Sequence, residues 1–276
     1  MKTKLTAAAY LGFLTTAFIV FNPAPVRAAN TIISDAFTGA NGASVPGRTP
    51  DTTNLPGATY YGDIQTSTID NTAGNPANSA NTGFNSRTMI SIGSAGSYVK
   101  PSVLTISADL QMNGLTDGGG FIRGLGLGFY PIENNTGVVN GSSLFTGLAV
   151  KPDGTLALVL GGVQQAASVV PFSGYSTATF YNLSYSISTA TGSITNVVFN
   201  GNNDTATFSG ATTAGDFTDA GTNFVGFYGS SAVAGAGGHV DNFVVSSTAP
   251  VPEPSSAVLL FGGLGALLAR RKRRSA

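Results

Sequence analysis

The most regular stretch of the sequence is Val103-Leu104-Thr105-Ile106-Ser107-Ala108-Asp109-Leu110-Gln111-Met112. Every second residue from Leu104 to Met112 is apolar, and the residues between them are mostly polar. Because successive side chains of a strand point to opposite faces, a period of two predicts a strand that buries one face.

A second strand is predicted after a turn at residues 113–120. Its sequence is Gly124-Leu125-Gly126-Leu127-Gly128-Phe129, with apolar residues on one face and only glycine on the other. A bare strand face marks close approach of another backbone, a bend, or a flat surface that a ligand could contact. Packing is the favoured interpretation, and a ligand-facing surface is the alternative.

The rest of the middle region repeats short apolar runs between turn residues, at spacings of roughly 8 to 12 residues that are typical of a sandwich or barrel. Residues 39–56 and 71–85 are rich in turn-forming residues and are predicted as loops, and residues 151–154 and 190–192 as hairpin turns. Further strands are predicted at residues 31–33, 60–61, 144–150, 155–160, 179–188, 194–199, 205–208, 224–228 and 240–245. The middle region is therefore predicted to be all-β, with about a dozen strands.

Both ends of the chain are hydrophobic and are set apart from this fold. Lys2 and Lys4 precede an uncharged run at residues 5–21, and Val26-Arg27-Ala28 follows as a cleavage region that ends in a small residue. This pattern predicts a secretory signal peptide over residues 1–28, cleaved after Ala28 or Ala29, with an uncleaved anchor as the alternative.

The C-terminal segment, residues 251–276, has three parts in order. Pro252, Glu253 and Pro254 form a short stiff triplet, since proline fixes φ and cannot continue a helix. Residues 257–269 are uncharged, and as a helix they would span only about 20 Å of a hydrocarbon layer of roughly 30 Å. A basic cluster follows, formed by Arg270, Arg271, Lys272, Arg273 and Arg274. Each of these charges costs about 2.5 to 3.5 kcal/mol in the bilayer centre, so the predicted transmembrane helix halts with its end in the cytoplasm.

This order of triplet, short span and basic cluster resembles the PEP-CTERM sorting signal of Gram-negative bacteria. The resemblance implies that an exosortase processes the chain near Pro252 to Pro254 after transient inner-membrane insertion. It also implies delivery to the cell surface or to the exopolysaccharide matrix. An ordinary C-terminal membrane anchor is the alternative.

The charge of the middle region restricts its partners. Residues 30–250 contain five basic and twelve acidic residues, a net charge of −7. Such a surface repels phosphate backbones and argues against nucleic acid as a partner. The chain has no cysteine, so neither disulfides nor thiol chemistry contributes. The 221 residues from Asn30 to Pro250 are enough for a single all-β domain held by its core.

Two separate segments resemble the first and last strands of concanavalin-like lectin and glucanase jelly rolls. They are Ile33-Ser34-Asp35-Ala36-Phe37-Thr38-Gly39, followed by Gly47-Arg48-Thr49-Pro50-Asp51, and the closing Val240-Asp241-Asn242-Phe243-Val244-Val245. The resemblance implies an antiparallel β-sandwich whose first and last strands lie side by side. The chain lacks the tryptophan that often follows the opening segment in such domains.

Residues typical of catalysis are scarce. Glu133 and Glu253 are the only glutamates, so the close glutamate pair of retaining glucanases is missing. His239 is the only histidine; it shares a strand face with Asp241, but no nucleophile elbow accompanies them, and a polar edge position is the favoured interpretation. No catalytic residue, metal site or cofactor is predicted, although residues 200–204 and 216–219 could hold Ca²⁺ through oxygen ligands.

Six tyrosines could stack on a sugar: Tyr60, Tyr61, Tyr130, Tyr175, Tyr181 and Tyr228.

The terminal segments and the scarcity of catalytic residues together predict a non-enzymatic exported protein of the cell surface or extracellular matrix, associated with exopolysaccharide. A lectin-like module that binds a cell-surface glycan and a divergent glycoside hydrolase are the alternatives.

Overall fold

The computed structural model describes residues 30–55, 57–63, 67–71, 79–82, 85–92, 103–117, 122–130, 145–188, 191–209, 224–233 and 237–247. The predicted signal peptide, its cleavage residues Ala28 and Ala29, and the whole predicted sorting signal lie outside these residues. No helix in the described part of the chain has the length and hydropathy of a membrane span.

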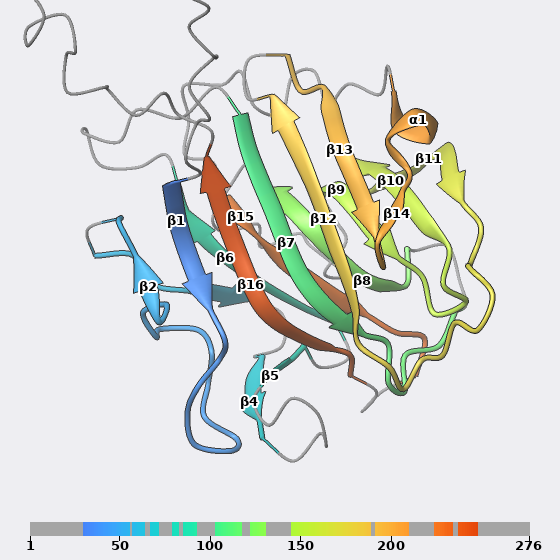
Figure 1. Cartoon of the computed structure of the whole chain (residues 1–276). Coiled ribbons are helices and arrows are strands. Elements are labelled where there is room, and N and C mark those ends of the chain that lie inside the picture. The colour runs from blue at the N-terminus through green and yellow to red at the C-terminus, as the bar shows by residue number, and fades with distance from the viewer. Residues whose placement is uncertain are drawn as a thin grey trace, which may run out of the picture.

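Two antiparallel sheets form the fold (Figure 1). Sheet A has the order β14-β13-β12-β7-β16-β1-β2, and β5 pairs with both β16 and β4. Its strands are β14 (Asn202–Asn203), β13 (Ile194–Phe199), β12 (Tyr181–Ser188), β7 (Val103–Gln111), β16 (His239–Ser247), β1 (Asn30–Asp35), β2 (Thr52–Thr53), β5 (Ser79–Asn81) and β4 (Thr68–Asp70).

Sheet B has the order β11-β10-β9-β8-β15-β6-β3. Its strands are β11 (Val163–Val169), β10 (Leu156–Leu160), β9 (Thr146–Val150), β8 (Gly124–Tyr130), β15 (Phe224–Ser230), β6 (Asn85–Ser91) and β3 (Tyr61–Asp63). One short helix, α1 (Thr205–Phe208), is present in the described residues.

Strand β7 lies at the centre of sheet A, and its alternation is the predicted one. Leu104, Ile106, Ala108 and Leu110 are fully buried, while Asp109 on the other face is partly exposed. The buried residues belong to one hydrophobic core together with Leu125 and Leu127 of β8 and residues of several other strands in both sheets. The all-β prediction, a single antiparallel sandwich of the jelly-roll type, is therefore confirmed.

The first and last strands pair directly, as the second resemblance implied. Strand β1 is antiparallel to β16, with Asn30 opposite Ser247 and Asp35 opposite Phe243. On its other side β16 pairs with β7. The last strand in the chain is thus an interior strand of sheet A.

The glycine face of β8 is a packing surface, in line with the favoured interpretation. A methyl group at Gly126 would overlap the rings of Tyr228 and Phe145, and one at Gly128 would overlap Phe145 and the backbone of β9. Tyr228 and Phe145 themselves contact in a T-shaped arrangement with ring centroids 4.7 Å apart. Aromatic rings from neighbouring elements therefore fill the space that the glycines leave.

One predicted strand is wrong. Residues 205–208 form α1 because the chain leaves the sheet after the tight β13–β14 hairpin at Asn200 and Gly201, both of which have positive φ. The Thr205 hydroxyl accepts the hydrogen bond of the Val197 amide, which a strand backbone would otherwise accept, at 2.9 Å. Phe208 then turns into the core. Four residues are too short for a period of two to be distinguished from a helical turn.

Several strands were not predicted. Residues 71–85 were expected to be a loop, yet β5 lies within them and β6 begins at residue 85. Strands β4 and β11 also lacked a sequence prediction, because β4 has only three residues and only two of the seven residues of β11 are branched or aromatic.

Candidate functional site

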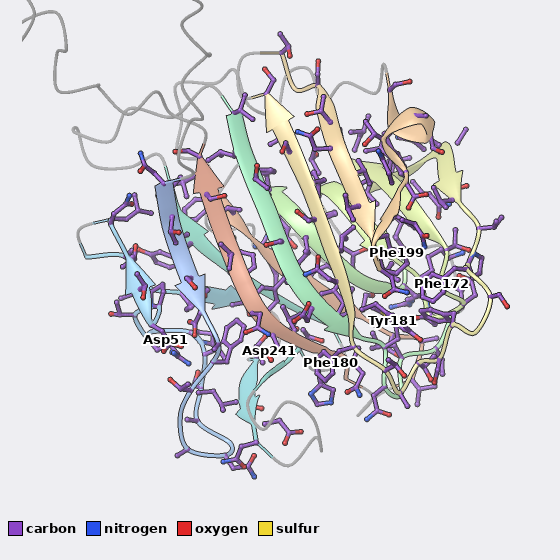
Figure 2. The ribbon with its side chains drawn as sticks, in the orientation of Figure 1. Asp51, Phe172, Phe180, Tyr181, Phe199 and Asp241 are labelled. Carbon is purple, nitrogen blue, oxygen red and sulfur yellow. The ribbon has the colours of Figure 1, made fainter. Side chains whose placement is uncertain are left out.

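A cluster of carboxylate and amide groups lies on the outer face of sheet A, and we call Asp109, Asn182, Asp241 and Asn242 the Asp109 cluster. Asp109 comes from β7, Asn182 from β12, and Asp241 and Asn242 from β16. Asp109 lies opposite Asn182 on one side and opposite Asp241 on the other. Three neighbouring strands thus bring these residues together, and Figure 2 shows Asp241 on β16.

Both oxygens of the Asp109 carboxylate accept hydrogen bonds from amides. Asn182 Nδ2 donates to Oδ1 at 2.9 Å, and Asn242 Nδ2 donates to Oδ2 at 2.8 Å. Both asparagines are exposed, whereas Asp109 is partly exposed. The cluster is therefore an ordered set of donors and acceptors at the protein surface.

A bulge in β16 places Asn242 in this cluster. The register of β16 on β7 shifts by one residue between Asp241 and Val244. Asn242 has φ of 49°, in the left-handed region that asparagine tolerates better than most residues. The extra residue is what allows two consecutive side chains, Asp241 and Asn242, to serve one polar cluster.

Asp241 is buried and differs from its partners. Burial raises the pKa of its carboxyl to about 6, helped by the nearby Asp109 and opposed by a hydrogen bond from its neighbour's backbone. That bond runs from Asn242 N to Asp241 Oδ1 at 2.7 Å. The side chain of Asp241 is enclosed, and its carboxyl accepts a hydrogen bond within the bulge.

His239 lies on the same face, one alternate position from Asp241. It pairs with Gln111 of β7 and with Asn81 of β5 and is 4% exposed. The prediction that His239 occupies a polar edge position is therefore wrong, because β5 pairs with the side of β16 that was expected to be unpaired. Burial lowers the pKa of the His239 imidazole, opposed by Asp70, so the neutral form is favoured.

The opening segments of the sandwich form a second, more buried polar group. Arg48 Nη2 contacts Asp35 Oδ1 at 2.9 Å and Asp51 Oδ1 at 2.6 Å. The Phe37 amide donates to Asp35 Oδ1 at 2.7 Å, and burial raises the pKa of Asp35 to about 7 against the opposing effect of Arg48. This network holds the loop after β1 against the strand. Asp35 is only 1% exposed, so its carboxyl is not available at the surface to contact a ligand.

The six candidate tyrosines are mostly unsuited to sugar stacking. Tyr61 is the one exposed member at 39%, and its ring contacts Phe224 edge-on at 5.8 Å. Tyr175 is partly buried and stacks on Tyr181. The buried members are Tyr60, Tyr130, Tyr181 and Tyr228.

The other sequence-predicted residues divide into two sets. Residues 200–204 form the β13–β14 hairpin, where Asn203 Oδ1 accepts the Thr205 amide, so this candidate calcium ligand serves the turn. Among the described residues no group of three or more histidines or acids could hold a metal ion. Outside the described residues lie residues 216–219, Glu133, and the predicted sorting residues Pro252, Glu253, Pro254, Arg270, Arg271, Lys272, Arg273 and Arg274.

Sequence reasoning missed the Asp109 cluster. It sought two acids on one strand, whereas Asp109 and Asp241 lie on different strands and are 132 residues apart in the chain. The pairing of β7 with β16, which joins them, has no local signature. The only indication in the sequence was the charged side chain of Asp109 on the outward face of the strand predicted at residues 103–112.

Comparison with known proteins identifies the C-terminal segment. The family of the PEP-CTERM protein-sorting motif matches residues 250–274, which confirms the predicted sorting signal. No curated protein matches the sequence of the whole chain.

Several solved structures are similar to this chain at low identity. Domain 4 of a GH43 extracellular arabinanase from Geobacillus stearothermophilus, in complex with arabinotriose, has 16% identity and a TM-score of 0.46 over 81% of this chain and 95% of that chain. A carbohydrate recognition domain of Emp46p has 14% identity and a TM-score of 0.41 over 76% and 98%. Lectin I-B4 from Griffonia simplicifolia has 10% identity and a TM-score of 0.41 over 69% and 93%.

Proposed function

We propose that this protein is a non-enzymatic component of the cell surface or extracellular matrix, released from its membrane tail by an exosortase and associated with exopolysaccharide. The observation that carries the proposal is the PEP-CTERM motif at residues 250–274. An exported protein with that motif is a substrate of exosortase processing.

Every described strand lies between Asn30 and Ser247, after the predicted cleavage at Ala28 or Ala29 and before the motif. Removal of both terminal segments would leave every described strand in place.

The processing step is tested by replacing the triplet. Alanine at Pro252, Glu253 and Pro254 together is expected to move the protein from the matrix and medium to the inner-membrane fraction. Thr248→Ala, which alters a residue just before the matched motif, is the control and should be processed normally. Release of the triple variant in the same amount as the unaltered protein would overturn the exosortase assignment.

A second candidate function is glycan binding, favoured by the Asp109 cluster. Carboxylates and side-chain amides form paired hydrogen bonds with neighbouring hydroxyl groups, and the exposed Asn182 and Asn242 offer such groups from an ordered frame. The chemistry suits a neutral or hydroxyl-rich saccharide. A strongly anionic one would be repelled by Asp109.

Binding to purified exopolysaccharide, with and without Ca²⁺, separates the two candidates. Under glycan binding through the cluster, Asn182→Ala should weaken binding at least several-fold while Thr179→Ala, an exposed change beside β12, leaves it unaltered. No binding by the unaltered protein would reject this candidate. Release of reducing ends from the same polysaccharide would instead support the glycoside hydrolase alternative.

A further inference from the structure

Both chain ends leave the sandwich at one end of sheet A. Asn30 is paired with Ser247, so the start of β1 and the end of β16 are neighbours (Figure 1). Strand β7 begins at this same end, because Leu104 lies opposite Ser247, and β12 finishes there with Ser188 opposite Val103. We call this the exit end of sheet A.

The described strand residues at the exit end carry no charged side chains. No residue is charged among the first five of β1 and of β7, the last five of β16, or the last four of β12. Hydroxyl side chains predominate on the outward positions there: Thr31, Thr105, Ser107, Ser186, Ser188, Thr195 and Ser246, of which Ser186 is buried.

The carboxylates of sheet A lie away from the exit end. Asp35 is the last residue of β1, Asp109 the seventh of β7, and Asp241 the third of β16. At about 3.3 Å per residue, Asp109 is roughly 20 Å from the start of its strand. Figure 2 shows Asp51 and Asp241 toward the end of the sheet opposite to the arrowhead of β16. The domain is therefore polarised along its strands, with an uncharged end and an acidic end.

The tether between fold and membrane is short. Pro252 lies five positions after Ser247, and Ala257, where the uncharged span begins, lies ten positions after it. Fully extended chain covers at most about 3.6 Å per residue, so the triplet is within roughly 18 Å of the end of β16. The triplet is therefore held closer to the exit end than the length of β16, which is about 26 Å for nine residues.

We propose that, before release, the sandwich stands with the exit end of sheet A against the anionic outer surface of the inner membrane and with the Asp109 cluster directed outward. This inference rests on the proposed sorting function. A carboxylate-free end is the one that approaches anionic lipid without repulsion, since each like charge brought near the surface costs free energy. The orientation presents the triplet to a membrane-embedded exosortase while the polar cluster faces away from the inner membrane.

Single cysteines test the orientation, because the chain has no cysteine of its own. Thr195→Cys places a fluorophore at the exit end, on β13 and four strands from β1, and Thr179→Cys places one just before β12 at the opposite end; both threonines are exposed. The full chain, isolated with its tail from exosortase-deficient cells, is reconstituted in vesicles of phosphatidylethanolamine and phosphatidylglycerol that carry nitroxide-labelled head groups.

Quenching at Thr195→Cys is expected to exceed that at Thr179→Cys several-fold. Equal or reversed quenching in a chain that sediments with the vesicles would overturn the orientation and leave the sorting proposal intact. A chain that does not sediment with the vesicles would overturn both, since its tail is then no membrane span. Thr31→Cys, exposed on β1, is a second exit-end probe should Thr195→Cys fail to fold.

Discussion

At the scale of the residue, Asp35 is the side chain on which the first loop depends. Its carboxylate accepts the amide of Phe37, a bulky residue with φ of 49°, and contacts Arg48. A non-glycine residue rarely adopts such a φ without compensation. The ring of Phe37 in turn packs against Phe227 at 5.7 Å, so one carboxylate links a strained turn to the core.

The raised pKa of Asp35 gives a signed pH dependence. Because the folded value is about 7 and the ordinary value 3.8, the folded state binds this proton more tightly. The corresponding stability is fully present below about pH 4 and is lost as the pH rises through about 7. We expect the advantage of the unaltered protein over Asp35→Asn to be greater at about pH 4.5 than at pH 7.5, by on the order of 2 kcal/mol, in urea unfolding.

Asp51 provides a control, because its effect on stability should change with pH in the opposite direction. Although burial raises its pKa, hydrogen bonds from Ala36 and Thr38 and the charge of Arg48 bring it below the ordinary value. The stability that this carboxylate contributes is present above the ordinary value and is lost as the pH falls. The advantage over Asp51→Asn should therefore shrink on acidification, and the same trend in both variants would contradict the assignment of the Asp35 pKa.

Gly126 occupies a position of β8 that has no room for a side chain. Gly126→Ala would place a methyl group against the rings of Tyr228 and Phe145. Overpacking of this kind costs about 1 to 3 kcal/mol, and thermal unfolding should report it as a lower Tm. Thr195→Ala, an exposed change on β13, should stay within about 0.5 kcal/mol of the unaltered protein. An equal effect of the two would mean that sheet B shifts to admit the methyl group.

At the scale of the element, the strand that closes the chain also completes the fold. Strand β16 pairs with β7 along one side and with β1 and β5 along the other. Strands β1 and β2 cannot join β7 in sheet A until β16 is available, so this pairing between distant parts of the chain is expected late in folding.

Two truncated chains examine this dependence. A chain of residues 30–248 should unfold cooperatively like the protein with its tail. A chain of residues 30–238, which lacks β16, should show no cooperative transition in circular dichroism, because β7 and β1 lose their common partner. A cooperative transition in the shorter chain would contradict the central position of β16.

Strand prediction succeeded where the side chains carry a strong local pattern and failed where pairing alone makes a strand. The alternation of 103–112 and the apolar run of 194–199 correspond closely to β7 and β13. Ser79-Ala80-Asn81 becomes a strand only because β16 and β4 flank it. The same non-local pairing creates the Asp109 cluster, which is why its residues could not be selected from sequence.

At the scale of the whole molecule, the arrangement of charge and termini is the basis of the orientation that we propose for the domain before release. The two processing junctions adjoin paired strands, Asn30 and Ser247, and the acidic residues of sheet A lie away from them. The sorting signal itself was readable from sequence because its three parts are consecutive, and the match over residues 250–274 agrees. The sandwich then supplies a stable body that needs neither terminal segment.

The most direct test of this account is the intact mass of the protein recovered from its native host, together with the sequences of both terminal peptides. The account predicts a chain that begins at Ala29 or Asn30 and ends near Pro252 to Pro254. A recovered chain that still carries Leu259 to Arg274 would contradict it, and the protein would then be a sandwich held in the membrane by a permanent anchor.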